Sequence, residues 1–134
     1  MAEADLATLL KTLEVKRHGG LWCFATIPVE DSSWAELMTL ASIRHIAMVF
    51  TEDEGLSVIH RADSDASPET CWVWLELSVY SDLNAVGFLS RIAAALTEAG
   101  VPCNAVAAYH HDHIFVPEAK AGAALNALQK LRQG

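Results

Sequence analysis

The sequence predicts an α+β protein made of two ferredoxin-like subdomains, each of the βαββαβ type with an antiparallel sheet. Short apolar runs that alternate with period two favour strands, and longer amphipathic runs favour helices. The expected order is α-β-β-α-β-β in the first half and β-α-β-β-α in the second. Both halves therefore contain a β-α-β-β core, but neither is complete in sequence order. A permuted or exchanged element between the halves would complete both.

The first half is expected to contain a helix, two strands, a second helix and a hairpin, over residues 3–12, 13–17, 21–27, about ten residues from 33, and 44–60. Pro28 ends the second strand because it cannot donate to a sheet. Ser33 and Glu36 fit the S-x-x-E capping box, in which each side chain satisfies an amide at the helix start. Gly55 suits the hairpin turn because it can adopt positive φ.

The second half is expected to contain strand 71–80, a helix of about 13 residues from near Val86, strands 101–109 and 113–116, and a helix over residues 118–132. Gly100 and Pro102 mark the end of its first helix. Strand 71–80 has an aliphatic face and a second face with Trp72, Trp74 and Tyr80. We expect this second face to pack between the two halves or between two chains.

The expected domain boundaries follow from composition. The segment 63–70 is small and polar and contains Pro68, so it is typical of a linker. It separates a first subdomain, residues 1–62, from a second, residues 71–134.

Composition and charge exclude several classes of partner. Hydrophobic residues make up 52% of the chain and the formal net charge is −8, with no basic run. Neither nucleic acid nor an anionic membrane is expected to bind, because both need clustered Lys and Arg. The N-terminus lacks the features of a secretory signal. The three cysteines are widely spaced, and we expect reduced thiols in a cytoplasmic protein.

The loop at residues 81–87 is the first candidate site. A helix start leaves about four amide groups without partners inside the helix, and its dipole favours an anion. Gly87 has no Cβ, so a carboxylate could approach the backbone of Val86, Gly87 and Phe88. Asp82 would suit an ammonium group. Alternatively, Ser81 or Asn84 only caps the helix and Gly87 eases packing.

The second candidate is the turn at residues 110–113, His-His-Asp-His. In an extended chain His111 and His113 share one face, and His110 and Asp112 share the other. Two imidazoles and a carboxylate could bind zinc or another divalent metal. However, no fourth ligand is evident nearby, and turns commonly contain Asp and exposed polar residues. We therefore favour a structural or ligand-proximal turn and expect no metal, with a metal-binding protein or metal-dependent enzyme as the alternative.

Catalytic motifs are lacking. The serines lie in no G-x-S-x-G sequence, and no cysteine has a suggestive histidine neighbour. Glycine-rich phosphate loops are absent as well. The sequence therefore favours a protein that is not an enzyme and needs no cofactor.

Residues 82–96, DLNAVGFLSRIAAAL, followed by EAGV at 98–101, are similar to the ACT-domain signature of polar loop, glycine, helix, Ala-Gly and strand. AVAAYHHDHIFVP at 105–117, with DEGLSVIHR at 53–61, resembles a bacterial family of small stand-alone tandem ACT proteins. The CASTOR-type arginine sensors of animals share a comparable tandem arrangement. The loop at residues 28–33 has no glycine, so the first subdomain resembles a degenerate copy.

The resemblance implies a non-catalytic regulatory protein that binds a small molecule, most simply an amino acid, and forms a homodimer. It also implies that Asn84, three residues before the loop glycine, contacts the ligand. The expected ligand site therefore comprises Asp82, Asn84, Val86, Gly87 and Phe88. A purely structural oligomerisation module with an unused loop is the remaining alternative.

Overall fold

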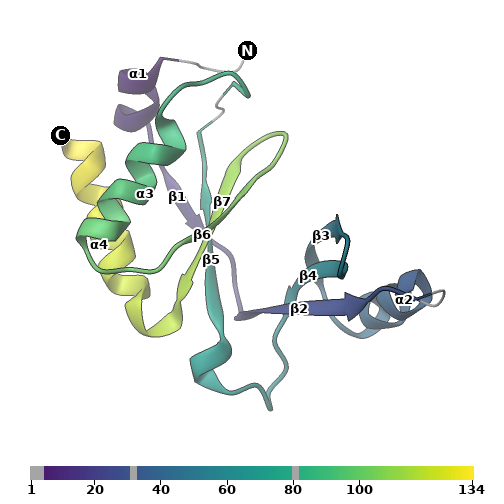
Figure 1. The fold of residues 1–134 in the computed structure, drawn as a ribbon. Helices are drawn as coiled ribbons and strands as arrows, with labels where there is room; N and C mark the ends of the chain where they lie inside the picture. Colours follow the sequence, from purple (N-terminus) through teal and green to yellow (C-terminus); the bar gives the residue numbers. More distant parts are fainter. Residues whose placement is uncertain (1–4, 31–32, 80–81) are drawn as a thin grey trace. The chain divides into compact units, whose positions relative to one another are not determined.

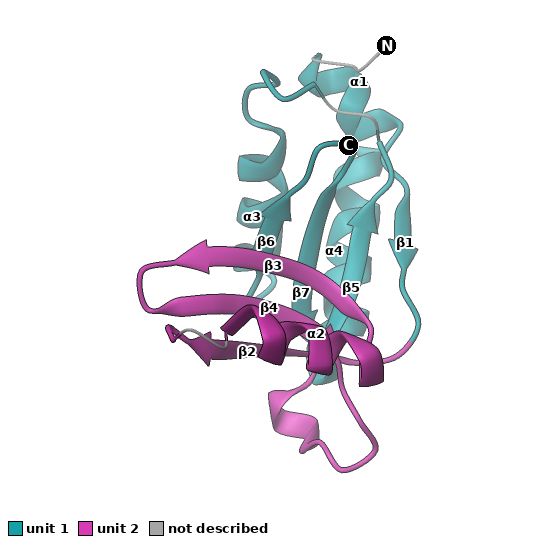
Figure 2. Ribbon diagram, turned by 90° about the vertical axis from the view of Figure 1, so that its right-hand side faces the viewer, with its two compact units in different colours: residues 1–19, 72–134 teal, residues 20–71 magenta. Residues whose placement is uncertain are grey.

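The computed structural model describes residues 5–30, 33–79 and 82–134, and the chain divides into two compact units (Figures 1 and 2). Unit 1 comprises residues 1–19 and 72–134, and unit 2 comprises residues 20–71. Tyr80 and Ser81, which belong to the expected aromatic face and ligand loop, lie outside the described residues.

Unit 1 has a four-stranded antiparallel sheet in the order β1-β5-β7-β6, covered on one side by three helices (Figure 1). The strands are β1 (Val15–Arg17), β5 (Trp72–Leu77), β6 (Asn104–Ala107) and β7 (Asp112–Pro117), and the helices are α1 (Leu6–Lys11), α3 (Phe88–Glu98) and α4 (Ala121–Gln133). The second half of the chain supplies β-α-β-β-α, and β1 supplies the missing fourth strand. This confirms the predicted α+β fold class with an antiparallel sheet. The added strand completes the sheet of unit 1 alone, whereas the expected exchange was to complete both halves.

The compact units group residues 1–19 with residues 72–134, a division that differs from the predicted subdomains 1–62 and 71–134. Val15 pairs with Leu77 in antiparallel register, and the amide of Ser78 donates to the carbonyl of Glu14 at 2.7 Å. Leu9 in α1 is only 1% exposed. Backbone pairing and apolar burial together explain why the N-terminal segment packs in unit 1.

The core of unit 1 lies between the sheet and the helices. The odd positions of β5, namely Val73, Leu75 and Leu77, are completely buried, as their alternation predicts. Helices α3 and α4 add a matching apolar stripe of buried residues, Ile92, Leu96, Ala124 and Leu128. The even positions of β5 consequently face the side of the sheet that carries no helix of this unit.

Helix α3 ends where the sequence predicts. Gly100 has φ 73°, and its amide donates to the carbonyl of Thr97, while the amide of Val101 donates to Leu96. This is the left-handed glycine termination that satisfies the last helical carbonyls. The helix begins at Phe88, two residues later than expected, because Gly87 is also left-handed.

Unit 2 has the three-stranded antiparallel sheet β3-β4-β2 and one helix, α2 (Ser33–Ile43). Its strands are β2 (Trp22–Pro28), β3 (Ile46–Glu52) and β4 (Gly55–Arg61). Ile27, Leu37, Leu56 and Val58 form its core. Gly55 is required in the hairpin because a Cβ there would overlap the carbonyl oxygen of Ile27.

The start of α2 differs from the expected capping box. Ser33 is the first residue of the helix, and its hydroxyl donates to the carbonyls of Pro28 and Glu30 and accepts from the amide of Glu30. The hydroxyl thus links the helix start to the backbone of Pro28 and Glu30. Further along, Trp34 and Met38 lie one helical turn apart and are 57% and 68% exposed.

Two short 3₁₀ turns, Pro68–Thr70 and Glu118–Lys120, complete the described elements. Within the described ranges, no helix combines the length and the apolar character needed to cross a bilayer.

Replacing Leu9 by Ala tests the assignment of the N-terminal segment to unit 1. Loss of a buried leucine should lower the free energy of unfolding by about 2–5 kcal/mol. Hydrogen exchange should become faster in residues 72–134 and stay unchanged in residues 20–71. The control Leu83→Ala, at a side chain that is 70% exposed, should change stability by less than about 0.5 kcal/mol. Faster exchange confined to residues 20–71 would contradict the assignment.

Candidate functional site

The loop before α3 is ordered by its own backbone. Asp82 accepts the amide of Asn84 through Oδ1 at 2.7 Å and the amide of Ala85 through its carbonyl oxygen at 2.9 Å. This is an Asx-type turn, in which an aspartate carboxylate holds the backbone two residues further on. The carboxylate of Asp82 therefore already accepts one hydrogen bond within the loop. The side chain of Asn84 is exposed.

The start of α3 has the features of an anion site. Gly87 is its N-cap, with φ 87°, and among the described residues no side chain caps the helix there. Ser81, one of the expected cap candidates, lies outside the described residues. A Cβ at Gly87 would lie 3.6 Å from Cδ2 of Leu6, an ordinary contact, so the backbone conformation and not the space requires glycine. Phe88 is buried and fixes the first turn in the core. The first-turn amides of α3 thus have no side-chain acceptor at the N-cap.

A cavity of about 170 Å³ adjoins this loop. It is lined by the loop, the first turn of α3, the end of β6 and the start of β7, namely Asp82, Leu83, Ala85, Phe88, Leu89, Ala107, Ala108 and Asp112. Two carboxylates from distant parts of the sequence therefore line one small cavity, and they favour a positively charged group. The volume is below the roughly 300–1,000 Å³ typical of sites for drug-sized ligands, so a small molecule fits it best.

The five predicted site residues have different places around this cavity. Asp82 and Phe88 line it, whereas Asn84, Val86 and Gly87 do not. The side chain of Val86 is 83% exposed. Sequence reasoning did not assign Asp112 to this site, because it considered that residue only as part of the His-rich turn.

The His-rich turn belongs to a different cluster on the helix-free face of the unit 1 sheet. Trp74 and Glu76, at even positions of β5, pair in register with Phe115 and His113 of β7. His18, just after β1, stacks on Trp74 with ring centroids 3.7 Å apart and planes 6° apart. Strands β5 and β7 and the residue that follows β1 therefore supply the members of this cluster.

Glu76 is the centre of the cluster. Its carboxylate lies 2.9 Å from Nε2 of His18 and 3.6 Å from Nδ1 of His111. The indole N–H of Trp74 donates to Nδ1 of His113 at 2.9 Å, so this nitrogen carries no proton. The aromatic face predicted from Trp74 is thus a polar network as well as a packing surface.

Burial and charge shift two pKa values in this cluster. Burial lowers the pKa of His113, while Glu76 opposes that shift and His111 and His18 add to it. For Glu76, burial alone would raise the pKa, but the hydrogen bond from His18 and the nearby histidine charges lower it overall. The fold therefore favours neutral His113 and ionised Glu76.

The cluster is not arranged as a metal centre. In the ranges 5–30, 33–79 and 82–134, no group of three His, Cys, Asp or Glu side chains is placed to bind one ion. The rings of His111 and His113 are 6.4 Å apart and perpendicular, and His110 packs edge-on against Tyr109. Glu76 and His18, which sequence reasoning missed, complete this cluster through hydrogen bonding and ring stacking.

The three cysteines, Cys23, Cys71 and Cys103, are free thiols. Burial raises the pKa of Cys103, and burial with the proximity of Cys71 raises the pKa of Cys23. A raised thiol pKa lowers the thiolate fraction, so these two residues are poorly suited to nucleophilic catalysis.

Comparison with known proteins identifies two matches to family models, both described as ACT domain, over residues 1–68 and 72–130. A Vibrio cholerae protein of unknown function, described as a possible transport protein, is 31% identical, with 96% of each chain covered and a TM-score of 0.73. No curated protein matches the chain.

Two more distant structures share the fold. The ligand-free regulatory subunit of aspartate kinase from Thermus thermophilus is 12% identical over 91% of this chain and 98% of its own, with a TM-score of 0.66. An Agrobacterium tumefaciens protein is 14% identical over 90% and 89%, with a TM-score of 0.62.

The titration of His113 gives a test of the cluster. Because its folded pKa is below the ordinary value of 6.5, the unfolded chain binds the proton first, and stability should fall as pH drops below about 6.5. Glu76 should add a further loss below about 4.5 because its pKa is also lowered. His113→Gln should reduce the fall in unfolding free energy between pH 7.5 and 5.5, measured by urea denaturation. His110→Gln, at an exposed position of the same turn, should keep the full fall. If the unfolding free energies of both variants fell equally with pH, the shifted pKa of His113 would not be the cause of the fall.

Proposed function

This chain belongs to the ACT domain family, and we propose that it is a non-catalytic regulatory protein that binds an amino acid at the loop before α3. The observation that carries the proposal is the start of α3 beside a small acidic cavity. Gly87, the N-cap, has no side chain to cap the first-turn amides, and no other described residue caps them there. Asp82 and Asp112 line the adjoining space. Membership of the ACT domain family supports a regulatory, ligand-binding role. The geometry at the start of α3 supports an amino acid as the ligand.

A zwitterion complements both parts of this arrangement. Its carboxylate would accept hydrogen bonds from the amides at the helix start, where the dipole also favours negative charge. Its ammonium group would lie towards the carboxylates of Asp82 and Asp112. The exposed side chain of Asn84 would donate to the same ligand from the loop. The ligand is thus held by charges of both signs in one small site.

We further propose a cytoplasmic homodimer. Three free cysteines are usual in a reducing compartment. The exposed side chains of Trp34 and Met38 on α2 form an apolar surface of the kind found at protein interfaces. The same surface favours the second candidate function, a structural oligomerisation module. That module would assemble through α2 and show no stabilisation by any amino acid.

Thermal denaturation with a panel of amino acids distinguishes the two functions. At a concentration of about 100 times Kd, a ligand that binds only the folded protein should add about 2.7 kcal/mol to the free energy of unfolding. Absence of any stabilisation across the panel, with oligomer formation that depends on Trp34 and Met38, would favour the structural module.

Gly87→Leu tests the position of the site. A side chain in this left-handed conformation should cost about 1–2 kcal/mol of stability and should remove the stabilisation by the amino acid, because it disturbs the helix start. Gly100→Leu is the matched control. It has φ 73° and open space around it, so it imposes comparable strain at the opposite end of α3 and should keep the ligand effect. Equal ligand effects in the two variants would place the site elsewhere.

A further inference from the structure

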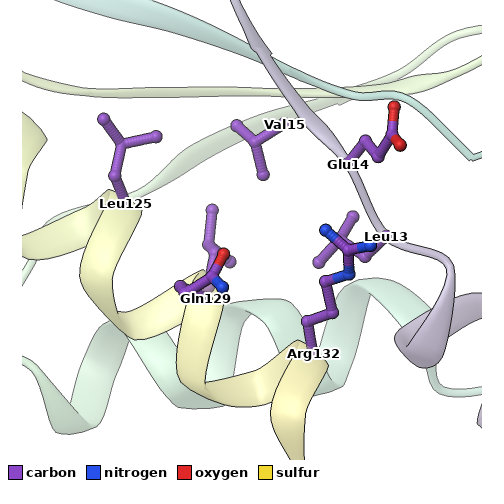
Figure 3. A pocket seen from close by; sticks show the side chains of 7 residues that line it. Leu13, Glu14, Val15, Leu125, Gln129 and Arg132 are labelled. Carbon is purple, nitrogen blue, oxygen red and sulfur yellow. The ribbon is translucent and has the colours of Figure 1, made fainter.

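A second, larger cavity lies in unit 1 between the β1 segment and α4 (Figure 3). Its volume is about 380 Å³, which falls within the roughly 300–1,000 Å³ range of small-molecule sites. None of its lining residues lines the cavity beside Asp82. It is therefore a separate space, and neither the loop nor the His-rich cluster accounts for it.

One part of this groove is apolar. Leu13 and Leu128 are buried and form its floor, and the half-buried side chains of Val15 and Leu125 form its walls. In Figure 3, Val15 and Leu125 lie on the side of the groove away from Arg132. Apolar surface that remains accessible in a concave site favours the hydrocarbon part of a ligand.

The opposite part carries polar side chains from one face of α4. Gln129 and Arg132 are three residues apart, so both project along the same side of the helix (Figure 3). Within the part of the chain that the structure describes, neither side chain has a hydrogen-bond or ion-pair partner. Their donors are available to a ligand.

Glu14 lies at the same end of the groove but does not neutralise Arg132. Its carboxylate points away from the guanidinium in Figure 3, and the two form no ion pair. Arg132 is the one cationic side chain among the residues that line this cavity. A guanidinium binds a carboxylate through two parallel hydrogen bonds. Glu14 beside it would disfavour a ligand with a second negative charge.

We propose that this groove binds a small monocarboxylic acid with a short branched apolar chain. Arg132 binds the carboxylate, the side-chain amide of Gln129 donates to it, and the chain lies between Val15 and Leu125. The inference goes beyond the proposed amino-acid site because it uses different residues and needs no ammonium group.

Amide chemical shifts of the ¹⁵N-labelled full chain test the proposal with 4-methylpentanoate as the probe. Saturable shifts should appear at Val15, Gln129 and Arg132. Isopentylamine has a similar branched chain with an ammonium group in place of the carboxylate and should leave these amides unchanged. Equal shifts with the amine, or no saturable shift with the acid, would overturn the proposal.

Arg132→Gln should weaken binding of the acid about tenfold or more, because a hydrogen bond to a charged group contributes about 1.5–3 kcal/mol. Lys130→Gln is the matched control, since it removes one positive charge from the same helix at a residue that does not line this groove. An equal loss in both variants would indicate a general charge effect and overturn the proposal.

The two sites can be tested separately. Gly87→Leu should leave binding of 4-methylpentanoate intact even where it removes stabilisation by an amino acid. Leucine shares the carboxylate and the branched chain, so leucine shifts at Val15 and Gln129 would support carboxylate recognition in the groove. Shifts of the acid confined to residues 82–89 would overturn the groove site and leave the proposed function standing.

Discussion

The pairing of β1 with β5 is the constraint on which unit 1 depends. The described part of residues 72–134 supplies three strands of this unit, β5, β6 and β7, and β1 pairs with residues 75–77 of β5 as the fourth. The pairing also positions His18 against Trp74, brings its nitrogen to Glu76, and places the backbone of residues 13–15 opposite α4. The polar cluster and the β1–α4 groove therefore both exist because an N-terminal strand completes a C-terminal sheet.

Local features of this fold could be predicted from the sequence, because their causes are local. The alternation in β5 and the left-handed stop at Gly100 depend on residues within one element. The assignment of β1 could not be predicted with the same certainty. The number of elements in each half indicated an exchange between the halves. However, β1 pairs with β5 across about 60 residues of sequence, and no short-range pattern encodes a pairing over that distance.

The candidate site likewise combines features that local sequence predicts with contacts that only strand pairing creates. The left-handed Gly87 and the turn at Asp82 follow from residue types in one loop. Asp112 lies near this loop only because the turn before β7 reaches the start of α3. Glu76 lies beside three histidines only because the register of β5 with β1 and β7 brings them together. Sequence reasoning grouped His111, Asp112 and His113 as neighbours along the chain. The structure instead divides them between a cavity and a sheet face.

The charge patterns of the two cavities explain why family membership alone does not give a ligand. Beside α3, the helix start favours negative charge and two carboxylates favour positive charge. A lone anion would therefore gain from the helix amides and lose to Asp82 and Asp112. Between β1 and α4, one guanidinium lies next to apolar walls and, among the described residues, forms no ion pair with Glu14 in the same lining. A molecule with separated charges suits the first space and a singly charged acid suits the second. The two proposals therefore assign different ligand classes to one small unit, because recognition depends on which side chains line each cavity and not on the fold they share.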